Sequence, residues 1–330
     1  MTYTPATRCI LNPQTRPSFN LAAEEWLLRN SREDIFMLWR NAAAVIVGRH
    51  QNTLAEIDPD FVQKRQIAVV RRISGGGAVF HDLGNVNFSF VRLGPGGEAS
   101  DFASFSAPIL EALRSLGVAC EFEGRNDLAV DGKKFSGNAQ HREHDRILHH
   151  GTLLFDARLD DLAGALRPDP LKFKGKAVKS APARVTLLRS YLPHLNAEAF
   201  MHEMLERVRQ SLGATRRDLD QAELEAIQEL ELKKYADKQW TYGASPPYSL
   251  KRRARTAAGI LELGLDVRGS VIHALRIQGD FFDLRPVEEL EALLVGCVHE
   301  RAALEQRLAV VNLADYVQGL DLQEFLACLL

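Results

Sequence analysis

Three consecutive glycines, Gly75 to Gly77, follow an apolar stretch that ends in Arg71 and Arg72. Adjacent glycines cost backbone entropy and add nothing to a core, so they persist where the backbone must approach another group closely. A strand that runs into such a segment exposes N–H groups that can bind phosphate or carboxylate oxygens. We therefore expect an anion-binding loop at the end of a buried strand, with both arginines placed to add charge-assisted hydrogen bonds. A plain turn between two strands is the alternative.

The pattern of apolar residues predicts both helices and strands. Helical periodicity recurs in residues 18–30, 102–116 and 197–213. Continuous or alternating apolar patterns predict strands at residues 34–40, 43–49, 67–74, 86–93 and 151–156. Residues 127–137 have the form of a hairpin with Asp131 and Gly132 in its turn. We expect a fold of mixed sheets and helices, of the α+β type within the broad α/β class.

A basic, polar segment around residue 252 is poor in apolar residues and marks the expected domain boundary. We expect a large domain over residues 1–250 and a small one over residues 256–330. The small domain begins with a predicted hairpin over residues 259–277. Two amphipathic helices are expected after this hairpin, near residues 286–306 and 313–329.

Composition and charge exclude several classes of protein. The 330 residues are 46% apolar and 25% charged, which is ordinary for a folded protein with a sizeable core. A formal net charge of -2 argues against a general nucleic-acid binder, although it permits a small basic pocket. No run has the length of a membrane span, residues 1–20 lack the pattern of a signal peptide, and the four cysteines form no CxxC pair. We expect a monomeric protein of the reducing cytoplasm that has no structural zinc site and binds neither nucleic acid nor membrane.

A second glycine-containing segment, residues 124–140, carries two adjacent lysines after the hairpin turn. Neighbouring side chains of a strand point to opposite faces, so at most one of Lys133 and Lys134 faces a pocket. Lys134 lies two residues before Ser136, and we expect both on the pocket side. Solvated lysines at a hairpin tip are the alternative. Residues 172–188 are also basic, and they predict either a mobile loop that closes on an anionic ligand or a solvated surface run.

Four stretches taken together resemble the lipoate–protein ligase A family of the biotin/lipoate protein ligase superfamily. They are RRISGGGAVFHDLGNVNFSF, GRNDLAVDGKKFSGNAQ, HHGTLLF and WTYGASPPYSL, in the order and approximate spacing of that family. The resemblance implies a catalytic domain of the biotin/lipoate ligase fold and a small α+β C-terminal accessory domain. It also implies two steps, the first of which converts ATP, with magnesium, and lipoate into lipoyl-adenylate and pyrophosphate. The lipoyl group then passes to a lysine of an acceptor, which is the lipoyl domain of a 2-oxoacid dehydrogenase acyltransferase subunit or the glycine-cleavage H protein.

Matching the family residue by residue implies a set of site residues. Lys134 matches the essential lysine, whose charge would bridge the lipoyl carbonyl and the α-phosphate. The residues that match the segments around ATP and lipoyl-AMP are Arg72, Ser74, Gly75, Gly76, Gly77, Ala78, Val79, Phe80, Asn85, Asn126, Asp127, Ser136, Gly137 and Ala139. Asp127 is also the expected neighbour of magnesium. The residues that match the lipoate pocket are Trp39, His81 and His150, and those that match the adenylate loop are Lys176, Lys179, Ser180 and Arg184.

The sequence departs from the family pattern at two positions. His141 stands where an arginine usually follows the SGxA segment, and Pro182 stands where the adenylate loop commonly has a basic residue. We therefore expect the contact of that arginine and the closure of the loop to differ here. Four histidines also crowd into residues 141–150, without the ligand spacing of a strong metal site.

Two other functions stay open on the sequence. Related octanoyltransferases and amidotransferases share the fold and move an acyl group from a carrier without ATP, often through a cysteine. Cys120 lies near the position where one such branch carries its nucleophile, and a buried structural cysteine is the alternative for it. The second is a non-catalytic binder of lipoyl domains or adenylates, which the retained Lys134 disfavours. Biotin ligation is disfavoured because the GRGRxGR-type loop is absent.

Overall fold

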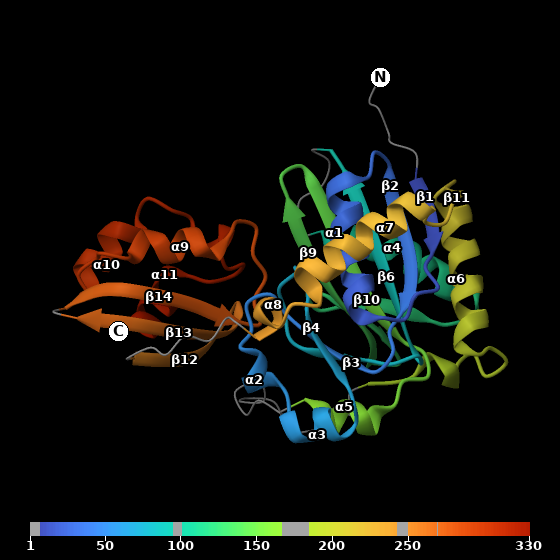
Figure 1. The fold of residues 1–330 in the computed structure, drawn as a ribbon, viewed down its shortest axis with the longest axis horizontal. Coiled ribbons are helices and arrows are strands. Elements are labelled where there is room, and N and C mark those ends of the chain that lie inside the picture. The colour runs from blue at the N-terminus through green and yellow to red at the C-terminus, as the bar shows by residue number, and fades with distance from the viewer. Residues whose placement is uncertain (1–6, 95–100, 167–184, 243–249, 269) are drawn as a thin grey trace.

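An eight-stranded mixed sheet forms the centre of the larger part of the molecule (Figure 1). The computed structural model describes residues 7–94, 101–166, 185–242, 250–268 and 270–330. Along the sheet the strands are β11 (Thr215–Arg216), β1 (Thr7–Leu11), β2 (Asp34–Arg40), β6 (Asn85–Leu93), β10 (Arg146–Leu154), β9 (Lys133–Glu143), β8 (Asp127–Val130) and β7 (Cys120–Glu123). β1 is parallel to both of its neighbours, and the other pairs are antiparallel. The predicted hairpin is confirmed, because Asp131 and Gly132 join β8 to β9 with φ values of 51° and 67°.

Helices cover both faces of this sheet. α4 (Phe102–Ser115) and α6 (Ala197–Ser211) pack on one face. The other face carries α1 (Pro17–Asn30), α7 (Gln221–Leu230) and the π-helix η4 (Glu231–Tyr235). Strand β2 shows the consequence, because Phe36 and Leu38 enter one core while Met37 and Trp39 enter the other. A strand that is buried on both faces carries a continuous apolar run, which is the pattern of this segment.

A second sheet, of three strands, holds the glycine segment. Its order is β4 (Ala68–Arg71), β3 (Ala44–Val47) and β5 (Val79–His81). β3 is parallel to β4 and antiparallel to β5, so the glycines form the connection between the two outer strands. The short helical segments in this part of the chain are α2 (Thr53–Glu56), α3 (Pro59–Lys64), α5 (Leu159–Ala165), η3 (Leu188–Ser190) and α8 (Lys238–Tyr242).

An antiparallel sheet with helices against it forms a C-terminal unit beside the first (Figure 1). Its strands are β12 (Leu250–Thr256), β13 (Gly259–Arg268) and β14 (Val271–Gly279). Its helical segments are α9 (Val287–Leu294), α10 (Arg301–Leu308), η5 (Leu313–Asp315) and α11 (Leu322–Leu329). The basic segment at which we expected the domain boundary is β12, and it pairs with β13. A division near residue 252 would cut this sheet, so we propose that the boundary lies before Leu250.

The two long helices predicted for the C-terminal unit are wrong in length. Residues 286–306 divide into α9 and α10 around Gly296, which has a φ of 81°. Residues 313–329 divide into η5 and α11 around Gly319, which has a φ of 84°. A residue with a left-handed backbone cannot continue a right-handed helix, so neither pair of segments can join into one helix. The apolar periodicity continues across both breaks because all four segments contribute to one core.

The loop after β14 joins the two units. Gly76 N–H donates to Phe281 O at 2.9 Å, and Gly279 N–H donates to His50 O at 2.9 Å. The ring of His50 stacks on Phe281 with 4.7 Å between the ring centroids. The His50 Nε2 atom also lies 3.2 Å from Asp283 Oδ1. The glycine segment therefore packs directly on the backbone of the C-terminal unit.

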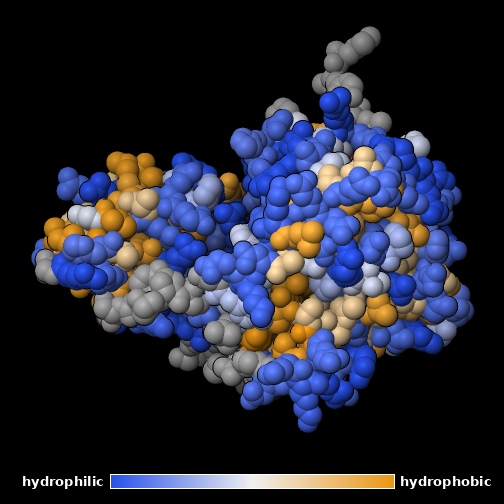
Figure 2. Space-filling model, viewed as in Figure 1, coloured by the Kyte–Doolittle hydropathy of each residue, from blue (hydrophilic) through white to orange (hydrophobic). Residues whose placement is uncertain are grey.

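Most of the face in Figure 2 is hydrophilic. Hydrophobic surface gathers in this view on the C-terminal unit and also below the centre, on the larger unit. The exposed Val295 and Val298 lie between α9 and α10, and the exposed Val310 follows α10. In the described parts of the chain, no helix has the length and apolar character needed to cross a membrane.

Candidate active site

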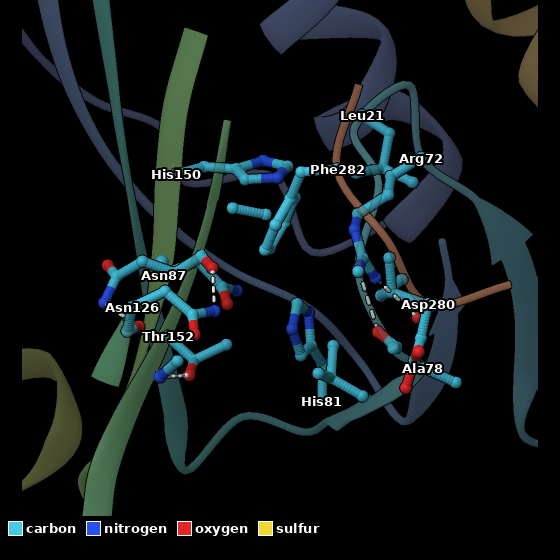
Figure 3. Close-up of a pocket in the computed structure, with 18 of the residues that line it drawn as sticks. Leu21, Arg72, Ala78, His81, Asn87, Asn126, His150, Thr152, Asp280 and Phe282 are labelled. Carbon is cyan, nitrogen blue, oxygen red and sulfur yellow. Dashed lines mark hydrogen bonds between the residues drawn. The ribbon is translucent and has the colours of Figure 1, made fainter. Parts of the chain in front are cut away.

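A cavity of about 340 Å³ opens between the glycine segment, the strands β6, β9 and β10, and the loop after β14. Its size falls within the range of small-molecule sites. Figure 3 shows His81 and Phe282 on opposite sides of this space, with Asn87 and Asn126 along another wall. Apolar lining comes from Leu21, Trp39, Ile46, Val79 and Phe282, and polar lining comes from Arg72, His81, Asn87, Arg125, Asn126, Lys134, Asn138, Thr152 and Asp280. The same cavity can therefore hold an apolar chain and an anionic group.

The glycine run has a structural reason in addition to any ligand. A Cβ on Gly75 would lie closer than 3.0 Å to Phe281 O, and a Cβ on Gly48 would lie as close to Gly76 O. Gly76 has a φ of 86°, which side chains disfavour, and a Cβ there would meet the Phe282 ring at 3.1 Å. The expected close approach is confirmed for neighbouring backbone, and Gly76 also lines the cavity.

Arg71 does not reach the cavity, so the expectation that both arginines face an anion is wrong for it. Its side chain is 2% exposed. The guanidinium donates to Thr53 Oγ1 and to backbone carbonyls, those of Gly48, Arg49, Gln51, Trp240 and Thr241. Because β4 alternates its side chains, Arg71 and Arg72 point to opposite sides, and Arg71 ties the glycine segment to α8.

Arg72 lines the cavity and holds the glycine segment in shape. It donates to Ser74 Oγ at 3.0 Å, Gly75 O at 2.6 Å and Gly77 O at 2.8 Å. A further bond goes to Ile46 O at 3.0 Å. Burial lowers the pKa of this guanidinium to about 10, which still leaves it charged at neutral pH. Arg72 therefore supplies positive charge to the cavity, while most of its N–H groups are hydrogen-bonded to the glycine segment.

Lys134 lines the cavity with its side chain 40% exposed, and its Nζ lies 2.7 Å from Asp127 Oδ1. Gly137 leaves room for it, because a Cβ at that position would meet Lys134 Nζ at 3.1 Å. The pairing of β8 with β9 shifts by one residue here, since Lys134 pairs with Ala129 and Ser136 pairs with Leu128.

This β-bulge breaks the strict alternation of the strand. Phe135 enters the main core, Ser136 is fully buried, and the cavity is lined by Lys134, Gly137, Asn138 and Ala139. We expected Lys134 and Ser136 on the pocket side of the strand. Lys134 does line the cavity, but Ser136 does not, because the bulge lies between the two residues.

A buried hydrogen-bonded chain fixes the aromatic part of the lining. Trp39 Nε1 donates to Ser89 Oγ at 2.8 Å, and Ser89 Oγ donates to Glu24 Oε1 at 2.6 Å. His150 Nδ1 lies 2.8 Å from the same Glu24 oxygen, and its Nε2 lies 2.6 Å from Ser74 Oγ. Both ring nitrogens of His150 and the indole nitrogen of Trp39 are thus bound to protein, so these rings present largely apolar surface to the cavity.

The Ser74, His150 and Glu24 side chains have the connectivity of a nucleophilic triad. Ser74 is fully buried, however, and its oxygen also accepts from Arg72 Nε at 3.0 Å. It does not line the cavity. The three residues therefore position the His150 ring and offer no reachable nucleophile.

Two family models match the chain. The lipoyl protein ligase A/B catalytic domain matches residues 16–209, and the bacterial lipoate protein ligase C-terminus matches residues 245–329. The chain belongs to the lipoyl protein ligase A/B family.

Relatives of this family match over nearly the full length. Lipoate–protein ligase 1 of Staphylococcus aureus is 38% identical over 319 residues, covering 96% of this chain and 97% of that protein. Lipoate-protein ligase LplJ of Bacillus subtilis is 37% identical over 316 residues, covering 94% and 96%. The crystal structure of P. falciparum LipL1 in complex with lipoate has a TM-score of 0.80 and 25% identity, covering 93% of this chain and 95% of that chain.

The structure brings many of the residues matched to the family into one cavity. Those that line it are Trp39, Arg72, Gly76, Gly77, Ala78, Val79, His81, Asn126, Lys134, Gly137, Ala139 and His150. Those that lie outside the lining are Ser74, Gly75, Phe80, Asn85, Asp127 and Ser136. Phe80 enters the core of the small sheet, and Asn85 donates through Nδ2 to Asn87 Oδ1 at 2.7 Å. The loop positions Lys176, Lys179, Ser180, Pro182 and Arg184 lie outside the described residues.

Sequence reasoning missed several lining residues of this family member. Asn87 lies two residues after Asn85 on β6, so strand alternation could have added it. Arg125 is next to Asn126, and its guanidinium lies 4.8 Å over the Phe282 ring. Asp280 and Phe282 come from the C-terminal unit, and no motif in the sequence connects them with the cavity.

Cys120 lies away from the cavity. It is 3% exposed, its thiol lies 3.8 Å from Leu110 O, and burial raises its pKa. A thioester route through Cys120 has no access to the lining described above. Among the histidines, His149 is fully buried and stacks on Phe105 at 5.0 Å between centroids. Within the described ranges, no group of three His, Cys, Asp or Glu side chains is arranged to hold a metal ion.

Proposed function

We propose that the protein is a lipoate–protein ligase that activates lipoate with ATP and transfers the lipoyl group to a lysine of an acceptor protein. One observation carries the proposal: an ammonium group, Lys134, lines a cavity that bare backbone and an apolar wall also line. Lipoate needs the apolar wall, and its carboxylate and the ATP phosphates need the cation and the N–H groups. The names of the full-length relatives point to the same reaction.

In the first step a lipoate carboxylate oxygen attacks the α-phosphorus of ATP. A new P–O bond forms, the bond from the α-phosphorus to the bridging oxygen breaks, and pyrophosphate leaves. Negative charge grows on the phosphoryl oxygens, where the Lys134 ammonium and the N–H groups of Gly77 and Ala78 would stabilise it. Preorganised donors of this kind contribute several kcal/mol, roughly 3–4 for a single donor. Arg72 would keep those N–H groups in place through its bonds to Gly75 O and Gly77 O.

In the second step the acceptor lysine attacks the carbonyl carbon of the mixed anhydride. An amide bond forms, the bond to the phosphate oxygen breaks, and AMP leaves with the electron pair. The attacking amine loses a proton as the amide forms, and the departing phosphate or solvent takes it up. The charge of Lys134 offsets the negative charge on the carbonyl oxygen during attack, and Asp127, 2.7 Å from its Nζ, holds the ammonium in position.

The acyl chain is proposed to lie along Leu21, Trp39, Ile46 and Val79. A flat indole wall suits a dithiolane ring, and Trp39 is held by its bond to Ser89. The ring nitrogens of His150 and the indole nitrogen of Trp39 are bound to protein, so this wall would offer the acyl chain few unsatisfied polar groups. The reaction class follows from the whole cavity, whereas the preference for lipoate over other acids of similar length follows from this wall.

Magnesium is proposed to bind together with ATP. The fit rests on Asp127 and Asp280, whose carboxylates lie beside and within the cavity, because magnesium prefers oxygen ligands and usually shares them with substrate phosphates. When bound, the ion would neutralise phosphate charge. The proposed acceptors are lipoyl domains of 2-oxoacid dehydrogenase acyltransferase subunits and the glycine-cleavage H protein. The structure of a bipartite lipoate protein ligase and its E2 lipoyl domain from Thermoplasma acidophilum supports a lipoyl-domain acceptor.

Pyrophosphate release from ATP and free lipoate tests the proposal. We expect Lys134→Ala to abolish release, because the cavity loses its ammonium. Lys133→Ala is the matched control, since the neighbouring lysine is exposed and lies outside the lining, and it should keep full activity. Cys120→Ala should also stay active. No release by the wild type, or activity lost only in Cys120→Ala, would instead favour acyl transfer from a carrier.

A further inference from the structure

His81 lines the cavity with one ring nitrogen bound to protein and the other without a partner. The residue is 4% exposed, and its Nδ1 lies 3.0 Å from Asn41 Nδ2. Its Nε2 is buried and has no hydrogen-bond partner among the described residues. His150, on β10 of the eight-stranded sheet, differs because both of its ring nitrogens have protein partners. A buried polar atom without a partner requires an explanation, and at a residue that lines a cavity a contact with a bound ligand supplies one.

The amide orientation behind His81 follows from two backbone carbonyls. Asn20 Nδ2 donates to Gln14 O at 2.9 Å and to Arg40 O at 2.9 Å. Carbonyl oxygens only accept, so the nitrogen of Asn20 must face them. The same nitrogen lies 2.8 Å from Asn41 Oδ1, so its two hydrogens are shared among three oxygens. An amide nitrogen cannot accept, so Asn41 faces Asn20 with its oxygen and His81 with its nitrogen.

An amide nitrogen can only donate, so His81 Nδ1 must be the unprotonated, accepting nitrogen. A neutral imidazole then carries its hydrogen on Nε2, the ring nitrogen that has no partner among the described residues. Asn12 completes the chain, since its Nδ2 donates to Asn20 Oδ1 at 2.9 Å. Asn12, Asn20 and Asn41 are 2%, 0% and 0% exposed, so water does not compete for these bonds. We call these three residues the asparagine relay.

The charges around His81 keep its ring neutral. Burial, the positive charge of Arg72 and the neighbouring His150 together lower its pKa to about 3, and burial is the largest of the three causes. Lys134, from β9, lines the same cavity and adds positive charge. Glu24 of α1 is a carboxylate of this network and is bound to His150, and Asp280 lines the same cavity. Trp39 presents its edge to His81 with 6.1 Å between centroids and carries no charge.

We propose that His81 is a neutral hydrogen-bond donor, through Nε2–H, to a carboxyl oxygen of the bound acyl substrate, and that the asparagine relay positions it by setting its tautomer. This inference rests on the proposed function for the identity of the acceptor atom. A carboxyl oxygen is the strongest acceptor that an acyl substrate offers, whereas a dithiolane sulfur is a weak one. His81 cannot act as a base in this arrangement, because it would have to become an imidazolium next to Arg72.

Pyrophosphate release with ATP tests the donor role, with lipoate and with octanoate, which has the same carboxyl group and no sulfur. His81→Leu removes the donor, and we expect kcat/KM to fall about 10- to 100-fold with both acids. His81→Gln places an N–H near the Nε2 position and cannot take up a proton, so it should recover activity to within a few-fold. The wild-type rate should show no histidine ionisation between pH 6 and 9. A loss in His81→Leu confined to lipoate would show a sulfur contact and overturn the proposal, as would a His81→Gln that fails like His81→Leu.

The relay has its own test, and its first measurement does not depend on catalysis. In ¹⁵N NMR of the full chain, His81 should be neutral with hydrogen on Nε2 between pH 6 and 8. Asn41→Asp puts an acceptor at Nδ1, so it should shift hydrogen to Nδ1, raise the His81 pKa and introduce a pH dependence into the rate. Asn30→Asp, at an exposed asparagine of α1, is the matched control and should change neither.

The two failures are distinguishable. A wild type that releases no pyrophosphate but shows the Nε2–H tautomer would count against the proposed function alone. A spectrum with hydrogen on Nδ1, or a charged ring, would overturn the relay whatever the enzyme does.

Discussion

Replacement of Gly75 by alanine tests whether the glycine run serves the contact between the two units. Gly75 has no positive φ, so alanine fits its backbone and would by itself stabilise the protein by about 0.4–1 kcal/mol through the unfolded state. A Cβ there, however, would lie closer than 3.0 Å to Phe281 O and 3.1 Å from Phe282 Cα. Both are backbone atoms, so no side-chain rotation relieves the overlap.

The overlap should outweigh the gain. Phe281 O would have to move out to ordinary contact, beyond 3.4 Å, which breaks the 2.9 Å hydrogen bond that it accepts from Gly76 N–H. A buried N–H without a partner costs about 1–3 kcal/mol, and overpacking costs about as much. We expect a net loss of roughly 1–5 kcal/mol in the free energy that holds the two units together.

Calorimetry and amide hydrogen exchange at Gly76 measure this loss. The expected results are a Tm lower by several degrees and faster exchange of the Gly76 amide. Gly137→Ala is the matched control, because its Cβ would meet Lys134 Nζ, the far end of a flexible side chain, at 3.1 Å. It should keep stability and lose activity as Lys134 is displaced. A Gly75→Ala protein with wild-type Tm and a protected Gly76 amide would refute the reasoning.

Three further predictions use other parts of the molecule. Trp39→Val should widen the acyl wall and allow bulkier analogues, measured as pyrophosphate release with a series of acids; unchanged selectivity would remove Trp39 from the acyl site. His141 and Arg29 lower the pKa of Glu143 to about 2, so the ionised carboxyl stabilises the fold above about pH 4.5, and this is lost as the pH falls toward 2. Glu143→Gln should therefore be less stable than the wild type at pH 7, and the difference in unfolding free energy should vanish near pH 2. All four cysteines are buried, and burial raises the pKa of Cys9 to about 12 and also raises that of Cys120. The native protein should therefore react with no thiol reagent at pH 8. One fast-reacting thiol would reopen the thioester route.

Local pattern was enough for most of the elements in the large domain. The continuous apolar run of β2 predicted a strand buried on both faces, and the periodicities of α4 and α6 predicted helices over a core. The Asp-Gly pair predicted the hairpin between β8 and β9, because both residues tolerate a left-handed backbone. Periodicity failed in the C-terminal unit, where consecutive short helices share one core and so continue each other's pattern.

The sequence by itself determined the chemical parts of the site: three bare glycines beside an arginine, a lysine after a tight turn, and apolar strands to hold them. The tertiary structure alone decided how those parts are used. It turned Arg71 inward, moved Ser136 out of the lining through a bulge, brought Phe282 from the C-terminal unit, and left His81, whose Nδ1 contacts the buried Asn41, at the cavity wall with an Nε2 that is unpartnered in the described part of the chain. These features depend on how the strands are placed against one another and on which carbonyl and amide groups lie within 3 Å. Such distances join residues far apart in the chain, so the local sequence pattern does not contain them.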